Sequence, residues 1–364
     1  MKHILIGGYY GYGNIGDEAI LEAFAQKIAA YPQIKTTVLS ANPKYTTKTQ
    51  GLAAVSRNNP VSVISAFIKS NLFVQGGGGL IQDSTSWRSP YFYLGQLMLA
   101  HITARKIYIM GQGTGPLNGS FARFLTRELF GTAKAITVRD LSSKTFLTGS
   151  LPKNFDITIA SDLALMLDPA PDDVGEDILY DEGLGDLPEP ILAVTIKGNP
   201  KDRKLVGHYA TALNTWLDEH GGSVLMVPFF PRYDIPFSEK IMSGIKGKTG
   251  LIRESHKPSE ILSLYKHVDH ILAGRLHSIM FAALARTSFT PIVYDPKMIY
   301  FLEKIGLEST IITPIIGPKS IEESLLNDKD NSEILVEKVS KRLPPLIEQA
   351  QPNITKLLEI LEIA

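Results

Sequence analysis

The segment ILIGGYYGYGNIGDEAIL, residues 4–21, indicates how the amino-terminal part of the chain folds. Its first three residues, Ile4–Ile6, form an apolar run of the kind found in buried strands. Glycines follow, and those at positions 11, 13 and 16 have the spacing G-x-G-x-x-G. Asp17 and Glu18 stand where a helix should begin, because acidic residues are favoured in a first helical turn. The segment therefore predicts a strand, a glycine-rich turn and a helix, the repeating unit of α/β proteins.

The same glycine spacing occurs in dinucleotide-binding proteins, but two features argue against a nicotinamide cofactor. The carboxylates of Asp17 and Glu18 would compete with a pyrophosphate for the positive end of the helix. The dinucleotide motif also needs an acidic residue about 20 residues further on, to bind the ribose. The second predicted strand, residues 36–42, contains no acidic residue. We therefore expect no bound cofactor, and a dehydrogenase is the weakest of the functions considered.

Length and composition are those of a globular protein with two domains. The chain has 364 residues, and about 150 residues per domain is usual. Hydrophobic residues make up 44% and charged residues 20% of the chain, as in ordinary globular proteins. The 37 Lys and Arg residues balance the 37 Asp and Glu residues, so the net charge favours no polyanionic partner. We expect no nucleic-acid partner.

The chain contains no cysteine, which excludes disulfides, zinc thiolate sites and cysteine nucleophiles. No spacing of His, Asp and Glu resembles a metal site, so we expect no metal. The first apolar run is too short for a secretory signal, and no run reaches the roughly 18 apolar residues of a membrane span. These features predict a cytoplasmic protein with at most peripheral contact with a membrane.

Short apolar runs alternate with helix-length stretches along the chain, which predicts parallel sheets joined by helical crossovers. Residues 1–168 are expected to form an amino-terminal Rossmann-like domain. Residues 169–190, rich in Asp, Glu, Gly and Pro, are expected to form a linker. Residues 191–343 are expected to form a second Rossmann-like domain. Residues 344–364, which begin with two prolines expected to break a helix, should form a carboxyl-terminal helix that could pack on the first domain.

Ligands bind beyond the carboxyl ends of the strands in open parallel sheets, so the residues after each predicted strand are site candidates. Gly76–Gly79 follow one strand, and either a backbone that approaches a ligand or a tight packing turn would explain them. Gly111–Pro116 form a second glycine-rich turn. Arg139 follows another strand, where it would bind a carboxylate or phosphate or pair with Asp140 at the surface. Asp162 follows the next strand, as a base or a helix cap.

Two candidates lie in the second half of the chain. His277 follows a predicted strand and stands near the start of the next helix, a position that suits a titrating group or an anion contact. A single histidine is more often structural. Lys297 follows the last strand, and Pro296 would stiffen the turn and orient its ammonium group. The alternative for Lys297 is an ordinary surface lysine.

Together these segments resemble the polysaccharide pyruvyl transferases. The similar segments, in order along nearly the whole chain, are GYYGYGNIGDEAIL (Gly8–Leu21), GGGGLIQD (Gly76–Asp83), GQGTGP (Gly111–Pro116), VRD (Val138–Asp140), SD (Ser161–Asp162), GRLHS (Gly274–Ser278) and YDPK (Tyr294–Lys297). The branch most resembled pyruvylates cell-wall polymers that anchor surface-layer proteins. The resemblance implies two facing Rossmann-like domains with a cleft between them, as in GT-B glycosyltransferases. It also implies phosphoenolpyruvate as the donor, with Arg139, His277 and Lys297 as donor-site residues.

The candidate residues suit this chemistry. Phosphoenolpyruvate carries a carboxylate and a phosphate, which Arg139 and Lys297 could bind at its two ends. Ketal formation needs a proton at the methylene carbon, attack by two sugar hydroxyls and loss of phosphate, so His277 is a candidate general acid or phosphate contact. Asp17 and Glu18 are candidates for binding or deprotonating acceptor hydroxyls. The candidate substrate-binding residues are Gly11, Asn14, Asp17, Glu18, Gly77, Gly78, Gln112, Asp162, Arg275 and Ser278.

Two other functions remain open. A nucleotide-sugar glycosyltransferase of the same architecture would need a diphosphate site at a helix start in the second domain, which Arg275–Ser278 could supply. A non-catalytic carbohydrate-binding protein of the cell envelope would not need two cations and a titrating histidine.

The expected acceptor is an aminosugar of a lipid-linked polysaccharide precursor. Such an acceptor would bring the protein to the inner face of the cell membrane, and the aromatic segment Trp87–Tyr93 is a candidate contact. The alternative for this segment is a core or an acceptor-pocket wall.

Overall fold

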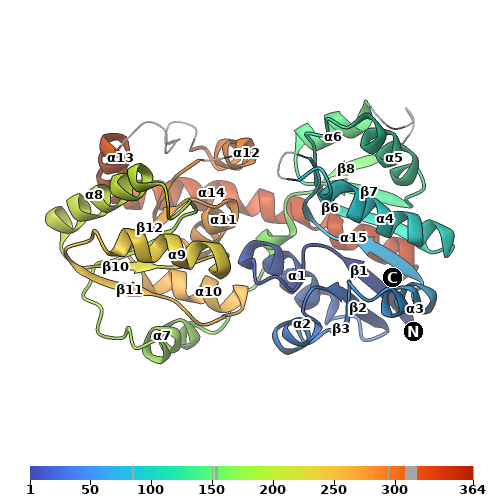
Figure 1. Ribbon diagram of the computed structural model, residues 1–364, viewed down its shortest axis with the longest axis horizontal. Helices are drawn as coiled ribbons and strands as arrows, with labels where there is room; N and C mark the ends of the chain where they lie inside the picture. The colour runs from blue at the N-terminus through green and yellow to red at the C-terminus, as the bar shows by residue number, and fades with distance from the viewer. Residues whose placement is uncertain (84–85, 150, 152–154, 294, 308–317, 364) are drawn as a thin grey trace. The chain divides into compact units, whose positions relative to one another are not determined.

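The computed structural model shows two compact units, each built on a parallel sheet with helices around it (Figure 1). The first unit comprises Met1–Tyr12, Asp17–Leu167 and Ile347–Ala364, and the second comprises Gly13–Gly16 and Asp168–Leu346. The structure describes residues 1–83, 86–149, 151, 155–293, 295–307 and 318–363. Parallel strands joined by helices are the arrangement that the alternating sequence pattern predicts.

The first unit contains an eight-stranded sheet in which the strand order reverses beside β1. The order is β3-β2-β1-β4-β6-β7-β8, and β5 pairs with β6. A reversal of this kind opens a crevice at the carboxyl ends of the strands on either side of it, here β1 and β4. The strands are β1 (Lys2–Gly7), β2 (Ile34–Ser40), β3 (Ala53–Ser56), β4 (Leu72–Gln75), β5 (Gly78–Ile81), β6 (Lys106–Thr114), β7 (Ala135–Val138) and β8 (Ile157–Ile159).

Helices connect these strands and bury their apolar sides against the sheet. Asn42 and Asn59 cap two of them, each followed by a proline in the first turn, which is the favoured start of a helix. Helix α4 packs against both α3 and α5, while α15 packs on β6 and β7 (Figure 1). The helices of this unit are α1 (Ile15–Ile28), α2 (Pro43–Gln50), α3 (Pro60–Lys69), α4 (Ser89–Ile102), α5 (Ser120–Phe130), α6 (Leu141–Thr148) and α15 (Pro352–Leu361), with a short 3₁₀ helix, η1 (Leu163–Met166).

The second unit has a five-stranded parallel sheet in the order β11-β10-β9-β12-β13, which reverses beside β9. Its core includes the fully buried side chains of Tyr209, Trp216 and Phe237. The strands are β9 (Ile191–Thr195), β10 (Ser223–Met226), β11 (Lys248–Leu251), β12 (His270–Ala273) and β13 (Phe289–Pro291). The helices are α7 (Asp172–Asp181), α8 (Arg203–His220), α9 (Pro231–Met242), α10 (Pro258–Leu264), α11 (Leu276–Ala285), α12 (Pro296–Lys304), α13 (Pro318–Asp330) and α14 (Ser332–Ala350), with a short 3₁₀ helix, η2 (Tyr265–His267).

Three segments differ from the expectations. The stretch expected as a linker, residues 169–190, contains α7, which packs on α10 and so belongs to the second unit. Five of its acidic residues are exposed on this helix rather than in a loop: Asp172, Asp173, Glu176, Asp177 and Asp181. Helix α14 continues through Pro344 and Pro345, because buried residues on either side, Leu343 and Ala350, hold both halves in the helix. The glycine run after β4 leads directly into strand β5, which pairs with β6.

A buried polar network joins β12, β13 and α13 in the second unit. His270 is fully buried, and its ring nitrogens lie 2.7 Å from Ser288 Oγ and 2.9 Å from Thr290 Oγ1. Burial lowers the pKa of His270 to about 3. Burial also raises the pKa of Asp328, on α13, to about 6, although a hydrogen bond with Thr290 opposes the shift. The network therefore favours a neutral histidine and a carboxyl group that keeps its proton up to about pH 6.

We expect Asp328→Asn to stabilise the protein at neutral pH. The carboxyl pKa is 3.8 in its ordinary state and about 6 in the fold, so the folded state binds more protons between these values. The contribution of Asp328 to the free energy of unfolding is therefore present below about pH 4 and lost as pH rises through about 6. Above that, the asparagine variant should be more stable by up to about 3 kcal/mol. Urea unfolding from about pH 5 to about pH 8 measures this. His270 contributes equally to both proteins, so its effect cancels when their free energies of unfolding are subtracted. If that difference does not grow with pH, the raised pKa of Asp328 is contradicted.

Candidate active site

Arg139 is the central charged residue at the carboxyl edge of the first unit's sheet. It follows β7 directly, and its side chain is only 8% exposed. Its Nη1 donates to Asp162 Oδ2 at 3.2 Å, and its Nε lies 3.7 Å from Asp140 Oδ2. Asp162 also accepts from Ala164 N, so it caps η1 as well as holding the arginine. Arg139 is therefore a buried, oriented guanidinium, not an exposed partner of Asp140.

Gly113 leaves room for the guanidinium group of Arg139. A Cβ at Gly113 would lie 2.6 Å from both Nε and Nη2 of Arg139, so the group lies flat against the backbone there. Gln112 is fully buried and donates to Gly78 O at 2.8 Å and to Gly113 O at 3.0 Å. Gly78 has a φ of +100°, a conformation that favours glycine. The structure thus brings together four of the predicted residues: Gly78, Gln112, Arg139 and Asp162.

Packing explains several other glycines and one carboxylate of the predicted motifs in the first unit. A Cβ at Gly76 would lie 2.1 Å from the hydroxyl of Tyr10, and one at Gly77 would lie 3.2 Å from Gly111 O, so close packing explains both glycines. Glu18 is fully buried and accepts from Gly11 N at 2.8 Å.

Gly11 has a φ of +80°, and its hydrogen bond to Glu18 fixes the first glycine turn. The Oδ1 of Asp17 would lie 3.1 Å from a Cβ at Gly78, so Asp17 lies beside Gly78.

The carboxyl-terminal segment supports this edge of the sheet from behind. Asn353 is fully buried on α15, where its Oδ1 accepts from Thr137 Oγ1 at 2.7 Å and its Nδ2 donates to Ser161 O at 3.0 Å. The backbone of Ser161 also donates to Gln349 O at 3.1 Å. Thr137 lies two residues before Arg139, and Ser161 precedes Asp162. The segment therefore holds both partners of the Arg139–Asp162 pair.

In the second unit, His277 lies in the first turn of α11, directly beyond β12. Residues 13–16 lie against it. A Cβ at Gly16 would be 2.2 Å from His277 Nδ1, and Ile15 N donates to Phe229 O at 2.8 Å. Asn14 accepts from Gly16 N at 3.3 Å and so shapes this loop. The first glycine motif thus contributes to the surroundings of the histidine.

Arg275 and Ser278, on either side of His277, fix the start of α11. Ser278 Oγ accepts from Arg275 N at 3.2 Å and donates to Arg275 O at 2.8 Å. The Arg275 guanidinium pairs with Asp234, whose side chain is 1% exposed. Burial raises the pKa of Asp234 and the charge of Arg275 opposes that shift. Both predicted residues therefore have structural partners.

Two lysines lie near the carboxyl edge of the second sheet. Lys297 Nζ lies 3.1 Å from Asp295 Oδ2, and Asp295 also caps α12 by accepting from Lys297 N. Tyr294, in the same motif, lies outside the described residues. Lys197 follows β9 and was missed by the sequence analysis. It is solvent-accessible, yet the surrounding protein displaces enough water to lower its pKa, and the charges of Arg275 and Lys297 act in the same direction.

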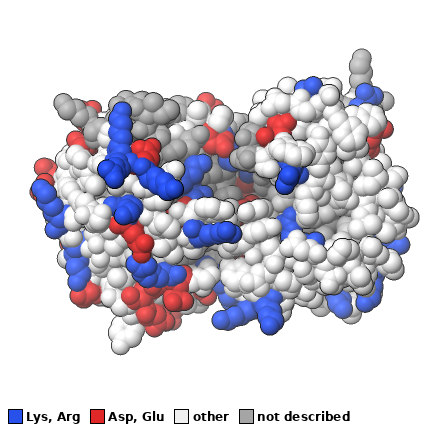
Figure 2. Space-filling model, viewed as in Figure 1, with Lys and Arg blue, Asp and Glu red and all other residues white. Residues whose placement is uncertain are grey.

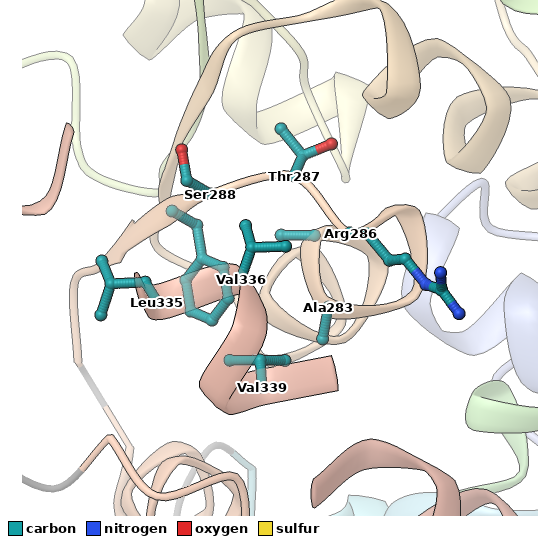
Figure 3. A pocket seen from close by; sticks show the side chains of 9 residues that line it. Ala283, Arg286, Thr287, Ser288, Leu335, Val336 and Val339 are labelled. Atoms are coloured by element: carbon teal, nitrogen blue, oxygen red, sulfur yellow. The ribbon is translucent and has the colours of Figure 1, made fainter. Parts of the chain in front are cut away.

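Two pockets lie away from these residues. Figure 3 shows one of about 10 Å³ beside the end of α11, lined mainly by small and apolar residues such as Ala283 and Val339, together with Arg286. It has room for about one water molecule. A pocket of about 420 Å³ lies beside residues 133–136, at the start of β7. That is the amino end of the strand, whereas ligands of such sheets bind at the carboxyl ends.

A comparison of sequence families decides the family. The profile of polysaccharide pyruvyl transferase matches residues 14–296. The chain belongs to this family. Arg139 and His277 lie within the matched segment of the pyruvyl transferase profile, and Lys297 lies directly after it. No curated protein matches the sequence.

Solved structures similar to this pyruvyl transferase family member show its fold. One is the S. aureus MnaA–UDP co-structure, with a TM-score of 0.67 and 12% identity, covering 100% of this chain and 98% of that one. Another is UDP-GlcNAc 2-epimerase from Neisseria meningitidis bound to UDP-GlcNAc, with a TM-score of 0.64 and 13% identity over 99% and 100% of the two chains. A third is Anabaena Alr3699/HepE in complex with UDP-glucose, with a TM-score of 0.64 and 10% identity over 99% and 100%. The fold is the GT-B type, with two Rossmann-like domains, as predicted.

Gly16→Ala tests whether the glycine motif positions His277 in this pyruvyl transferase family member. The added methyl group would overlap the imidazole, so the ring or the loop must move. We expect turnover to fall by about tenfold to a hundredfold, the usual cost of misplacing a reacting group by about 1 Å. Gly207→Ala on α8 is the matched control, because a Cβ there meets nothing within 4 Å. Equal turnover of the two variants would show that the contact has no catalytic role.

Proposed function

We propose that the protein transfers a pyruvyl group from phosphoenolpyruvate to two hydroxyls of a sugar, forming a cyclic ketal and releasing phosphate. The observation that carries this proposal is the buried, oriented guanidinium of Arg139 in a member of the polysaccharide pyruvyl transferase family. A guanidinium held in one plane by carboxylates on two sides presents its remaining N–H groups in a fixed direction, which suits a carboxylate or phosphate.

The proposed roles follow from the charge of each residue. Arg139 binds one anionic end of phosphoenolpyruvate, and Lys297 and Lys197 supply positive charge for the other. His277 gives a proton to the methylene carbon or binds the phosphate as it leaves. Protonation of the methylene carbon makes the neighbouring carbon, which carries the phosphate group, electrophilic. The first sugar hydroxyl adds to that neighbouring carbon, and its bond to the phosphate oxygen breaks. The second hydroxyl then adds to the same carbon and closes the ketal. One of the two hydroxyl protons replaces the proton given to the methylene carbon, and the other ends on the released phosphate.

We propose an acceptor that is an aminosugar of a lipid-linked cell-wall polysaccharide precursor, as in the branch that serves surface-layer anchoring. The enzyme would then act in the cytoplasm, at the inner face of the membrane, without a cofactor or a metal. The sequence resemblance described above supports this choice of acceptor and of location.

Phosphate release from phosphoenolpyruvate by the purified protein tests the donor. The assay is run with and without a synthetic lipid-linked aminosugar disaccharide diphosphate, and the acceptor is analysed by mass spectrometry. Acceptor-dependent release with a product heavier by one pyruvyl ketal is the expected result. If no phosphate is released but phosphoenolpyruvate raises the melting temperature, phosphoenolpyruvate remains the proposed donor and the acceptor is wrong. If neither occurs, phosphoenolpyruvate is not the donor.

One observation favours a second candidate, a nucleotide-sugar glycosyltransferase: several structurally similar proteins were solved with UDP or UDP-sugars bound. Calorimetric titration with UDP, UDP-GlcNAc and phosphoenolpyruvate separates the two. Binding of a nucleotide sugar without binding of phosphoenolpyruvate would favour the glycosyltransferase.

A further inference from the structure

Exposed hydrophobic side chains gather on α3, α4 and α5 of the first unit. On α3, Val61, Ile64 and Ile68 are 77%, 45% and 60% exposed and recur at helical spacing. Met98 and Ile102, one turn apart on α4, are also exposed. Because α4 packs against both α3 and α5, these residues belong to one surface of the unit. Figure 2 shows that the area over α4 is mostly without charged side chains.

Aromatic rings extend this surface from α4 to α5. The ring centroids of Trp87 and Tyr91 are 6.4 Å apart, those of Tyr91 and Phe121 6.1 Å, and those of Phe121 and Phe124 6.4 Å. Trp87, Phe121 and Phe124 are more than half exposed. Large exposed apolar patches usually mark an interaction site, because leaving such area in water is unfavourable. We call the aliphatic and aromatic residues of α3, α4 and α5, together with Trp87, the apolar face.

The charges around the apolar face are predominantly positive. Lys69, Arg88, Arg123 and Arg127 are exposed at its margins, and the Arg88 guanidinium lies 5.2 Å from the Trp87 ring. The sequences of α3 and α4 contain no Asp or Glu, and α5 contains only Glu128. This local charge stands in a chain whose net charge is +0. The excess of positive charge around the apolar face is therefore local.

We propose that the apolar face binds the surface of an anionic lipid bilayer. Trp and Tyr favour the boundary between water and lipid, aliphatic residues on amphipathic helices enter it, and Lys and Arg beside them attract anionic headgroups. A second copy of the chain is less suitable as the occupant, because face-to-face pairing would bring the same basic residues together. Among the described residues no helix is long and apolar enough to span a membrane. The apolar face would therefore hold the protein at the bilayer surface.

The proposal rests on this surface and not on the proposed activity, so its test is independent of turnover. The two tryptophans of the chain provide a direct readout. Trp87 is 67% exposed, whereas Trp216 is fully buried in the second unit. Adding vesicles of phosphatidylcholine and phosphatidylglycerol should shift tryptophan emission to shorter wavelength and protect it from iodide. Vesicles of phosphatidylcholine alone should do so much less. The Trp87→Phe variant should show no shift.

Vesicle flotation measures the binding itself. We expect the double variants Phe121→Ser/Phe124→Ser and Arg123→Glu/Arg127→Glu to lose about tenfold or more in partitioning. High salt should weaken wild-type binding, because it screens the headgroup charge. The matched control is Tyr180→Ser/Tyr233→Ser, which removes two exposed aromatic residues of the second unit and should bind as the wild type does.

Three results would overturn the proposal: no binding of the wild type to anionic vesicles, equal loss in the control, or a dimer in sedimentation that the Phe121→Ser/Phe124→Ser variant dissociates. The last would assign the face to a second copy of the chain. The emission shift uses the unaltered protein, so it decides the question even if a variant fails to fold.

Discussion

Replacing His277 by alanine is expected to lower kcat by about 10²- to 10⁴-fold, the usual contribution of a positioned proton donor. The residue stands at the start of α11, beyond the end of β12, and its ring is held against Gly16. In the proposed reaction the methylene carbon of phosphoenolpyruvate is a weak base that needs an acid, which is one of the two roles proposed for His277. Phosphate release under saturating donor and acceptor measures the effect. The melting temperature should change little, because the side chain is only partly buried.

His277→Gln distinguishes the two roles that the sequence leaves open for the histidine. Glutamine can still donate a hydrogen bond to a phosphate oxygen but cannot supply a proton at neutral pH. Substantial activity of the glutamine variant would assign phosphate binding, and loss equal to that of alanine would assign general acid catalysis. His208→Ala, on α8, is the control. Wild-type turnover of His277→Ala would remove the histidine from the mechanism.

Arg139→Ala should raise the KM for phosphoenolpyruvate and lower kcat, because the guanidinium is the buried cation of the first unit's site. It should also lower the free energy of unfolding by about 3 kcal/mol, since removing one partner of a buried ion pair leaves the other uncompensated. The remaining groups are the carboxylates of Asp162 and Asp140, 4% and 7% exposed. Kinetics and urea unfolding measure the two effects.

Gly113→Ala separates donor binding from stability in the same site. It keeps the charge of Arg139 but places a methyl group 2.6 Å from its Nε and Nη2, so the guanidinium must move. We expect the KM for phosphoenolpyruvate to rise about tenfold with a smaller loss of stability than in Arg139→Ala. An unchanged KM in both variants would show that Arg139 is only a structural partner of Asp162.

The sequence was informative where local patterns determine structure. Apolar runs followed by polar or glycine-rich turns predicted the strands, and with them the carboxyl edge of the first sheet, where Arg139 lies, and that of the second sheet, where His277 lies. It was less informative where long-range packing decides. Asp, Glu, Gly and Pro in residues 169–190 favour a loop locally, but contacts with α10 make α7 a helix. The two prolines of α14 weaken a helix that buried neighbours nevertheless maintain.

The residues missed in the site illustrate the same limit. Lys197 could have been found from the sequence, because it comes two residues after the buried strand β9, at the end of a strand, where the other candidates were sought. Asn353 carried none, since its importance comes from partners 216 and 192 residues away, Thr137 and Ser161. The pairing of Arg139 with Asp162 likewise depends on β7 and β8 being neighbours in the sheet. One-dimensional spacing does not contain that information.

The contacts of Asn353 and Gln349 also determine when the first unit can form during synthesis. Its sheet is encoded by the first 167 residues, but the helix that supports the ends of β6, β7 and β8 is encoded after the entire second unit. A ribosome must therefore translate residues 168–346 while the Arg139 edge still lacks its support. We expect the nascent first unit to remain sensitive to proteases until translation passes Asn353. Expression of residues 1–167 alone should then give a poorly folded fragment, which residues 347–364 supplied as a peptide should rescue.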